Sequence, residues 1–317
     1  MPTFQKIIET VKTPKDGQNQ RIALIKEIEQ ITNRRLLIYV ADFKKSPYSL
    51  ITPEDKTGFS DLIENINQPS VDIVVNSPGG FVEATESIVG MLRDKFENIR
   101  FIVPNMAKSA ATLMCLSGDS ILMDHRSELG PIDPQIEYPT REGRKREAAE
   151  DIIIGFKDAK KQLIKDGPKA VPAYIPLIDK YTIGLLKSCE NAIDLSKELA
   201  ECWLRKYMFN SEENSKLPKT IRDYFASHSA TLSHGRSIRI DKCKELGLVI
   251  TDLRTKEDLS NKIWKLWCLY ELHFERSPAH KIYENSEGCT LNKSQQQPQI
   301  QIPPQLLQQL KKMPVKN

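Results

Sequence analysis

The residues best suited to chemistry lie where two apolar runs end. The run at 73–75 leads into the sequence NSPGG, which contains Gly79 and Gly80, and the run at 101–103 is followed by Ser109 at the start of a helical pattern. Glycines after a strand leave backbone N–H groups unobstructed, and a helix N-terminus favours negative charge. A hydroxyl nucleophile beside such N–H groups, which can form an oxyanion hole, is the combination that an acyl-transfer site requires.

Either motif alone is common, as a strand terminator or as a helix cap. Their arrangement is more informative, because a complete βα unit separates Gly79 from Ser109. Consecutive βα units of a right-handed parallel sheet place both loops at the carboxyl edge, where ligands bind. We therefore expect the two motifs to form one site.

The surrounding elements predict an α/β fold with a mostly parallel sheet. Continuous apolar runs alternate with helical patterns, as expected for strands covered on both faces. The strand-like runs are 36–41, 73–75, 101–103 and 121–123. We expect 73–75 and 101–103 to be neighbouring parallel strands. Helical patterns also occur at 4–33, in a charged stretch at 141–165 and in a long apolar stripe at 182–207, whereas PKAVPAYIP at 168–176 is expected to be extended.

Three motifs together carry a resemblance to a known family. The sequences NSPGG, AKSAATLM and LGPIDPQ resemble Clp-fold serine peptidases, most closely the SDH-type (serine dehydrogenase proteinase) branch, with signal peptide peptidase A and ClpP as more distant relatives. The resemblance covers roughly residues 36–253. It implies a ClpP/crotonase-like spiral of βα units with helical N- and C-terminal extensions, and it implies a serine endopeptidase that hydrolyses peptide bonds.

The resemblance also implies roles for individual residues. Ser109 is the nucleophile, and the oxyanion hole uses backbone N–H groups of Gly79 or Gly80 and of Ala110. Ala111 departs from the family pattern, which usually has glycine there, and its added methyl group is expected to narrow the cleft. The adjacent Lys108 is expected to be solvated at the rim of the site.

The general base has three candidates. ClpP uses a histidine shortly after the strand that resembles LGP, but residues 129–133 contain none. Signal peptide peptidases use a lysine at the start of a later helix, and Lys187 or Lys180 occupies that general place. His234 falls close to the position of the ClpP triad acid. The order of preference is Lys187, His234 and Lys180.

Two other classes of function remain open. The first is a catalytically inactive Clp-fold protein that keeps the cleft for peptide binding or assembly, which the Ala111 departure and the ambiguous base favour. The second is a crotonase-type acyl-CoA enzyme, which would use paired backbone N–H groups around a thioester. Labelling of Ser109 by a fluorophosphonate distinguishes the peptidase from both.

The expected organisation has four parts. Residues 1–35 form a helical extension, 36–255 the peptidase core, 256–286 a C-terminal helix and 287–317 a disordered Gln/Pro-rich tail. Within the core, residues 136–180 are expected to form an insertion that acts as a lid or groove wall. The apolar stripe at 182–207 and the aromatic run at 264–274 suggest a homo-oligomer.

Composition excludes several classes of partner. The 317 residues carry a net charge of only +4, which does not indicate nucleic-acid binding. The sequence has no run of eighteen apolar residues and no apolar signal segment near its start, so we expect no membrane segment. Its six cysteines show no metal-binding spacing, which indicates no metal or other cofactor and a reducing, cytoplasmic setting. The expected partner is a peptide or protein substrate; without an ATPase motif, energy-dependent unfolding would need another protein.

Overall fold

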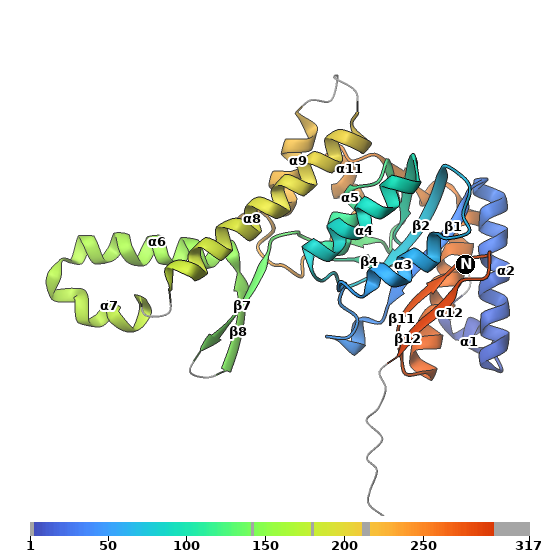
Figure 1. Cartoon of the computed structure of the whole chain (residues 1–317), viewed down its shortest axis with the longest axis horizontal. Coiled ribbons are helices and arrows are strands. Elements are labelled where there is room, and N and C mark those ends of the chain that lie inside the picture. Colours follow the sequence, from blue (N-terminus) through green and yellow to red (C-terminus); the bar gives the residue numbers. More distant parts are fainter. Residues whose placement is uncertain (1–2, 141–142, 179–180, 211–215, 295–317) are drawn as a thin grey trace, which may run out of the picture.

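A computed structural model of the chain describes residues 3–140, 143–178, 181–210 and 216–294. Its centre is a seven-stranded sheet in the order β10-β5-β3-β2-β1-β11-β12 (Figure 1). The first five strands in this order are parallel, and β11 and β12 are antiparallel to their neighbours. The parallel strands are β1 (Arg35–Ala41), β2 (Ser70–Asn76), β3 (Asn98–Ile102), β5 (Ser120–Met123) and β10 (Ile250–Asp252). The prediction of an α/β fold with a mostly parallel sheet is confirmed.

The predicted neighbouring strands are also confirmed. Ile73 of β2 pairs with Phe101 of β3, and the two strands run parallel. All three residues of the run at 73–75 are buried, because they are covered alternately from the two faces of the sheet: Ile73 and Val75 join one hydrophobic cluster and Val74 joins the other. Burial on both faces is the reason why the sequence shows a continuous apolar run instead of alternation.

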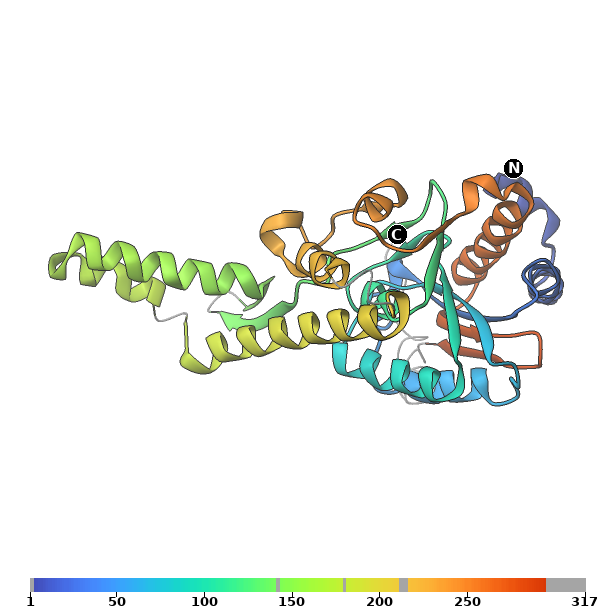
Figure 2. The ribbon, with the colours of Figure 1, turned by 90° about the horizontal axis from the view of Figure 1, so that it is seen from above.

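Helices cover both faces of the sheet, as Figures 1 and 2 show. One cluster includes residues of α3 (Asp55–Ile63), α4 (Val82–Lys95) and α5 (Ala110–Leu116). The other includes residues of α1 (Phe4–Thr10), α2 (Pro14–Thr32) and α12 (Glu257–Arg276). The helical extensions at the two ends of the chain therefore pack together on one face of the same sheet.

The aromatic run of α12 lies inside this packing. Tyr270 and Phe274 are buried, and the rings of Trp264 and Trp267 stack with their centroids 4.6 Å apart beside the same hydrophobic cluster. The prediction that this aromatic run forms an exposed surface for self-association was wrong. The partner that the sequence could not reveal is the pair of helices α1 and α2 of the same chain.

The C-terminal segment differs from the expected helix and tail. Helix α12 ends at Arg276, and the chain returns to the sheet as β11 (Ala279–Glu284) and β12 (Thr290–Ser294). β11 pairs with β1, so these strands extend the central sheet. The sequence hid them because β11 buries Lys281 and Glu284, residue types that normally mark a surface. The rest of the expected tail, 295–317, lies outside the described residues.

The insertion after the LGPIDPQ loop forms an arm, which we define as β7, β8, α6 and α7 with the first half of α8. Its elements are β7 (Gln135–Thr140), β8 (Gly143–Ala148), α6 (Ala149–Asp166), α7 (Val171–Ile178) and α8 (Ile183–Trp203). The arm extends away from the sheet in both views (Figures 1 and 2). Where a charged helix was expected from residue 141, the described residues Gly143–Ala148 form strand β8 and the helix begins only at Ala149. The stretch expected to be extended is helical from Pro168, which occupies the first helical position that proline favours.

Within the described parts of the chain, none of the helices is both long and apolar enough to cross a bilayer.

Candidate active site

A small second sheet brings three loops together. Its strands are β4 (Met106–Ala107), β6 (Glu128–Leu129) and β9 (Ile238–Arg239). β4 pairs in parallel with β6 through Ala107 and Leu129, and β6 pairs antiparallel with β9 through Leu129 and Ile238. Residues that follow β4 and β6 therefore lie at the same end of this sheet as residues that precede β9.

Three polar side chains are attached at that end. Ser109 comes two residues after β4, Asp133 comes four residues after β6, and His234 comes four residues before β9. The segments are far apart in the sequence, and the pairing of these short strands places them at the same end of the small sheet. Ser109 and His234 are both predicted from the sequence, which does not reveal this connection between them.

Ser109 starts α5 in an unusual backbone conformation. Its φ of 51° and ψ of −122° are sparsely populated by residues other than glycine and cost about 1–3 kcal/mol. The hydroxyl does not cap the helix, and among the described residues it has no hydrogen-bond partner. A half-buried serine with a strained backbone and an unused hydroxyl is suited to act as a nucleophile.

Gly79 lies directly against the nucleophile. Its φ is 89°, and a Cβ at this position would come 2.4 Å from the carbonyl oxygen of Lys108, 2.8 Å from Cβ of Ser109 and 2.9 Å from the backbone nitrogen of Ala110. Only glycine fits both this conformation and this space. The two motifs separated by a βα unit in the sequence are thus in contact.

The backbone N–H groups of Gly80 and Ala110 are among those in this region that lack an acceptor among the described residues. The N–H of Gly79 donates to Oγ of Ser77 at 3.2 Å, so it is already engaged. No hydrogen bond is found for the N–H of Gly80 or of Ala110. Gly80 lies opposite Ile51, whose own N–H donates to the carbonyl of Gly79 and whose carbonyl accepts from the N–H of Phe81. Free, fixed donors of this kind can stabilise an oxyanion.

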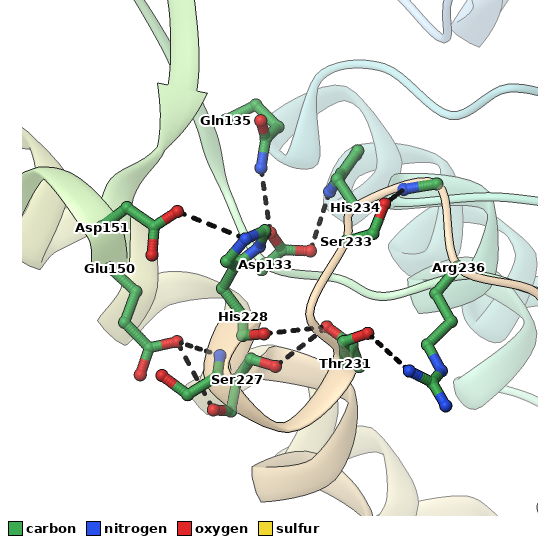
Figure 3. A network of polar contacts seen from close by, with 12 residues as sticks. Asp133, Gln135, Glu150, Asp151, Ser227, His228, Thr231, Ser233, His234 and Arg236 are labelled. Atoms are coloured by element: carbon green, nitrogen blue, oxygen red, sulfur yellow. Dashed lines mark hydrogen bonds and ion pairs between the residues drawn. The ribbon is translucent and has the colours of Figure 1, made fainter.

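A buried carboxylate contacts two histidines, as Figure 3 shows. Asp133, whose side chain is 2% exposed, lies with Oδ1 2.7 Å from Nδ1 of His234 and with Oδ2 2.9 Å from Nδ1 of His228. Gln135 donates to the same Oδ2 at 2.9 Å. With its Nδ1–H directed at Asp133, His234 in its neutral form keeps Nε2 as a proton acceptor.

The lysine candidates lie elsewhere. Lys187 is on α8 with its side chain 65% exposed, and its Nζ lies 3.3 Å from Oε2 of Glu190. Lys180 falls outside the described residues. Among the described residues, no recorded contact joins Lys187 to Ser109.

Lys108 is not a rim residue, so that expectation was wrong. Its side chain is 14% exposed, and its Nζ lies 2.8 Å from Oε2 of Glu128. Burial acts to raise the pKa of Glu128, but hydrogen bonds from Lys108 and Ser237 outweigh it and the pKa is lowered. The resulting ion pair fixes the backbone just before Ser109 to β6.

The departure at Ala111 has no effect on an open cleft. Ala111 is the second residue of α5, and its side chain is fully buried in the main hydrophobic cluster. The extra methyl group therefore adds to the core, and the expectation that it narrows the cleft was wrong.

The family follows from comparison with known proteins. The model of the ClpP-like SDH-type serine proteinases matches residues 15–287. The chain belongs to this family. Two uncharacterized proteins of Methanocaldococcus jannaschii resemble this chain: one is 29% identical over 62% of the chain and 72% of the relative, and the other is 26% identical over 79% and 76%.

Two solved structures are similar to this chain at low identity. One is a serine-to-alanine mutant of the 1510-N membrane-bound stomatin-specific protease, with a TM-score of 0.39 and 17% identity over 67% of this chain and 79% of the other. Another is an asparagine-to-aspartate mutant of ClpP1 from Listeria monocytogenes, with a TM-score of 0.35 and 15% identity over 72% and 98%.

Sequence reasoning missed two polar residues of this candidate site. Asp133 lay within the recognised LGPIDPQ motif, and an ionisable residue in a buried loop was the available signal. His228 gave no signal, because only the fold brings it to Asp133. Within the described chain no cluster of three or more histidine, cysteine or acidic side chains is suited to hold a metal ion.

Proposed function

We propose that the chain is a serine endopeptidase that uses Ser109, His234 and Asp133 as a catalytic triad. The observation that carries the proposal is the 2.7 Å contact between His234 Nδ1 and buried Asp133, at the sheet end where Ser109 starts its helix. In a triad, the carboxylate orients the imidazole and stabilises its protonated form. Compared with ClpP, histidine and acid would have exchanged places in the sequence.

The reaction would proceed in two steps, the formation of an ester on Ser109 and the hydrolysis of that ester. Oγ of Ser109 attacks the carbonyl carbon of the peptide bond while its proton passes to Nε2 of His234. His234 then gives this proton to the amine as the C–N bond breaks, leaving an ester on Ser109. Water attacks the ester, its proton passes to His234 and then back to Oγ of Ser109, and the acid product leaves.

The oxyanion hole would consist of the N–H groups of Gly80 and Ala110. Both lack an acceptor among the described residues. A Cβ on Gly79 would lie 2.9 Å from the nitrogen of Ala110, so a glycine is needed to keep that donor open. The N–H of Gly79, expected as an alternative donor, is already bonded to Ser77. Removing one donor of such a pair typically lowers turnover by about 10² to 10³.

His234 is preferred to the lysines on physical grounds. A lysine base must be desolvated to lose its proton near neutral pH, and Lys187 is largely exposed beside Glu190. Histidine needs no such environment. Lys180 is left as an untested alternative.

The class of substrate, the cellular location and self-association are proposed from the sequence and from the arm. The substrate would be a peptide or protein, and the protein would act in the cytoplasm, with a separate ATPase where unfolding is needed. Self-association through the arm is supported by its exposed apolar side chains, which include Ile154, Ile164, Val171, Ile175 and Ile183.

Reaction of the full chain with an alkyl fluorophosphonate tests the proposal. We expect a covalent adduct on Ser109, located by peptide mass spectrometry, and none on the Ser109→Ala variant. If the folded protein is not labelled, the inactive peptide-binding alternative is favoured. Labelling of Ser109→Ala at the wild-type rate would show that the nucleophile is wrongly assigned.

A further inference from the structure

The loop that carries His234 also carries a second histidine bound to the same carboxylate. His228 Nδ1 lies 2.9 Å from Oδ2 of Asp133, the oxygen that does not face His234. The other ring nitrogen of His228, Nε2, lies 3.2 Å from Oδ2 of Asp151, on the first turn of α6. His228 therefore stands between the buried acid and the arm (Figure 3).

A second contact holds the same parts together. Oε2 of Glu150, the neighbour of Asp151, accepts hydrogen bonds from the N–H of Ser229 at 3.1 Å and from Oγ of Ser227 at 3.4 Å. These residues flank His228 at the start of the short helix α10 (His228–Thr231). These hydrogen bonds fix the first turn of α6, which belongs to the arm, to the segment that leads to His234.

We propose that His228 is a positioning residue that orients Asp133 toward His234 and couples this orientation to the arm. The inference rests on the proposed triad. Without His228, Oδ2 of Asp133 would keep only Gln135, which is itself the first residue of β7 in the arm. Both partners of this oxygen therefore connect it to the arm.

Loss of His228 would affect the reaction through the imidazole of His234. Asp133 is buried, so the direction of its carboxylate is set by its hydrogen-bond partners and not by water. His234 follows the direction of Oδ1, and a small misplacement of a catalytic group lowers the rate strongly. His228 does not touch the reacting atoms and acts only through Asp133.

Two amide substitutions separate the two contacts of His228. In His228→Asn the amide nitrogen lies near the place of Nδ1 and can still donate to Asp133, but it does not reach Asp151. In His228→Gln the longer side chain reaches toward the place of Nε2, near Asp151, and leaves Asp133. His228→Ala removes both contacts.

The measurement is the second-order rate of fluorophosphonate labelling at Ser109 in the full chain. We expect His228→Ala and His228→Gln to lower this rate by about 10- to 100-fold, whereas His228→Asn stays within about threefold of wild type. Equal rates in His228→Ala and wild type, or faster labelling of His228→Gln than of His228→Asn, would overturn the positioning role.

The link to the arm has its own variant and control. Asp151→Ala removes the arm contact of His228 but leaves Asp133 bound, and we expect a loss of about threefold to tenfold in the labelling rate. Asp158→Ala removes an exposed carboxylate from the same helix and should change nothing. A wild-type rate in Asp151→Ala would overturn the coupling to the arm.

Failure of this inference is distinct from failure of the triad. Labelling that survives in Ser109→Ala, or that is unchanged in His234→Ala, would remove the triad itself. Labelling that is lost in Ser109→Ala and slow in His234→Ala but unchanged in His228→Ala would overturn only the role of His228.

Discussion

Gly79 and Ser109 are packed so closely that a Cβ on Gly79 would lie 2.8 Å from Cβ of Ser109. This contact joins the turn after β2 to the start of α5, and both follow neighbouring units of the sheet. A Cβ on Gly79 would also crowd the backbone nitrogen of Ala110. Because glycine has no Cβ, the space next to the nucleophile and the proposed oxyanion donor stays open.

Replacing Gly79 by valine should therefore strongly reduce the reactivity of Ser109. The side chain would collide with backbone atoms and would also require a φ of 89°, which β-branched residues avoid. We expect labelling of Ser109 to fall by about 10² or more. The rate is measured with the fluorophosphonate, alongside circular dichroism to show that the variant is folded.

Gly90 provides the matched control. It lies in α4, and a Cβ there meets nothing within 4 Å. Gly90→Ala should keep wild-type labelling and raise stability by about 0.5–1 kcal/mol, because alanine favours the helix. Similar losses in both variants would show that the space around Gly79 has no special role.

Ser109→Ala should remove activity without loss of stability. Its hydroxyl neither caps α5 nor binds a described residue, so the penalty of about 1 kcal/mol for a lost helix cap does not apply. We expect peptide hydrolysis to fall by about 10⁶ relative to wild type, as for loss of a nucleophile elsewhere. Thermal unfolding should be within about 1 °C of wild type. Full hydrolysis by the purified variant would contradict the reaction class.

His234→Ala and Lys187→Ala together decide which residue is the base. Removing His234 takes away the imidazole that Asp133 orients, and we expect labelling of Ser109 to fall by about 10² to 10⁴. Removing the exposed Lys187 breaks only its surface contact with Glu190 and should leave the rate unchanged. The opposite pattern would return the role of base to the lysine that the sequence alone had favoured.

The sequence predicted those features that depend on neighbouring residues or on regular topology. Buried strands appear as continuous apolar runs, and the βα order brings Gly79 to Ser109. It could not predict the partner of His234, because Asp133 is about a hundred residues away and meets it only through the pairing of β6 with β9. The same limit hid His228.

The C-terminal strands were hidden for a different reason. Polar residues in β11 suggest exposure, and their buried partners lie at the other end of the chain: Lys281 binds Asp55 of α3 and Glu284 binds Arg21 of α2. Burial of charge is tolerated only when it is paired, and pairing at this sequence separation leaves no local pattern. Hydrophobicity alone therefore placed these residues outside the core.

Asp55→Asn should accordingly destabilise the whole domain. Asp55 is fully buried and accepts from Nζ of Lys281 at 2.8 Å and from the hydroxyl of Tyr283 at 2.5 Å. Loss of the carboxylate leaves the buried ammonium of Lys281 without a counter-charge, which costs about 3–5 kcal/mol. Urea unfolding measures the loss, and Asp61→Asn, at an exposed position of the same helix, should change stability by less than about 0.5 kcal/mol.

The contribution of Asp55 should also depend on pH. Burial acts to raise its pKa, but the charge of Lys281 and the hydrogen bonds from Lys281 and Tyr283 outweigh it, so the pKa in the folded protein lies below the usual 3.8. The unfolded chain therefore binds the proton more readily, and the stabilisation is complete above pH 3.8 and is lost as the pH falls through the folded value. The free energy of unfolding of wild type minus that of Asp55→Asn should shrink below about pH 4. A difference that stays constant from about pH 6 to about pH 3 would contradict the ion pair.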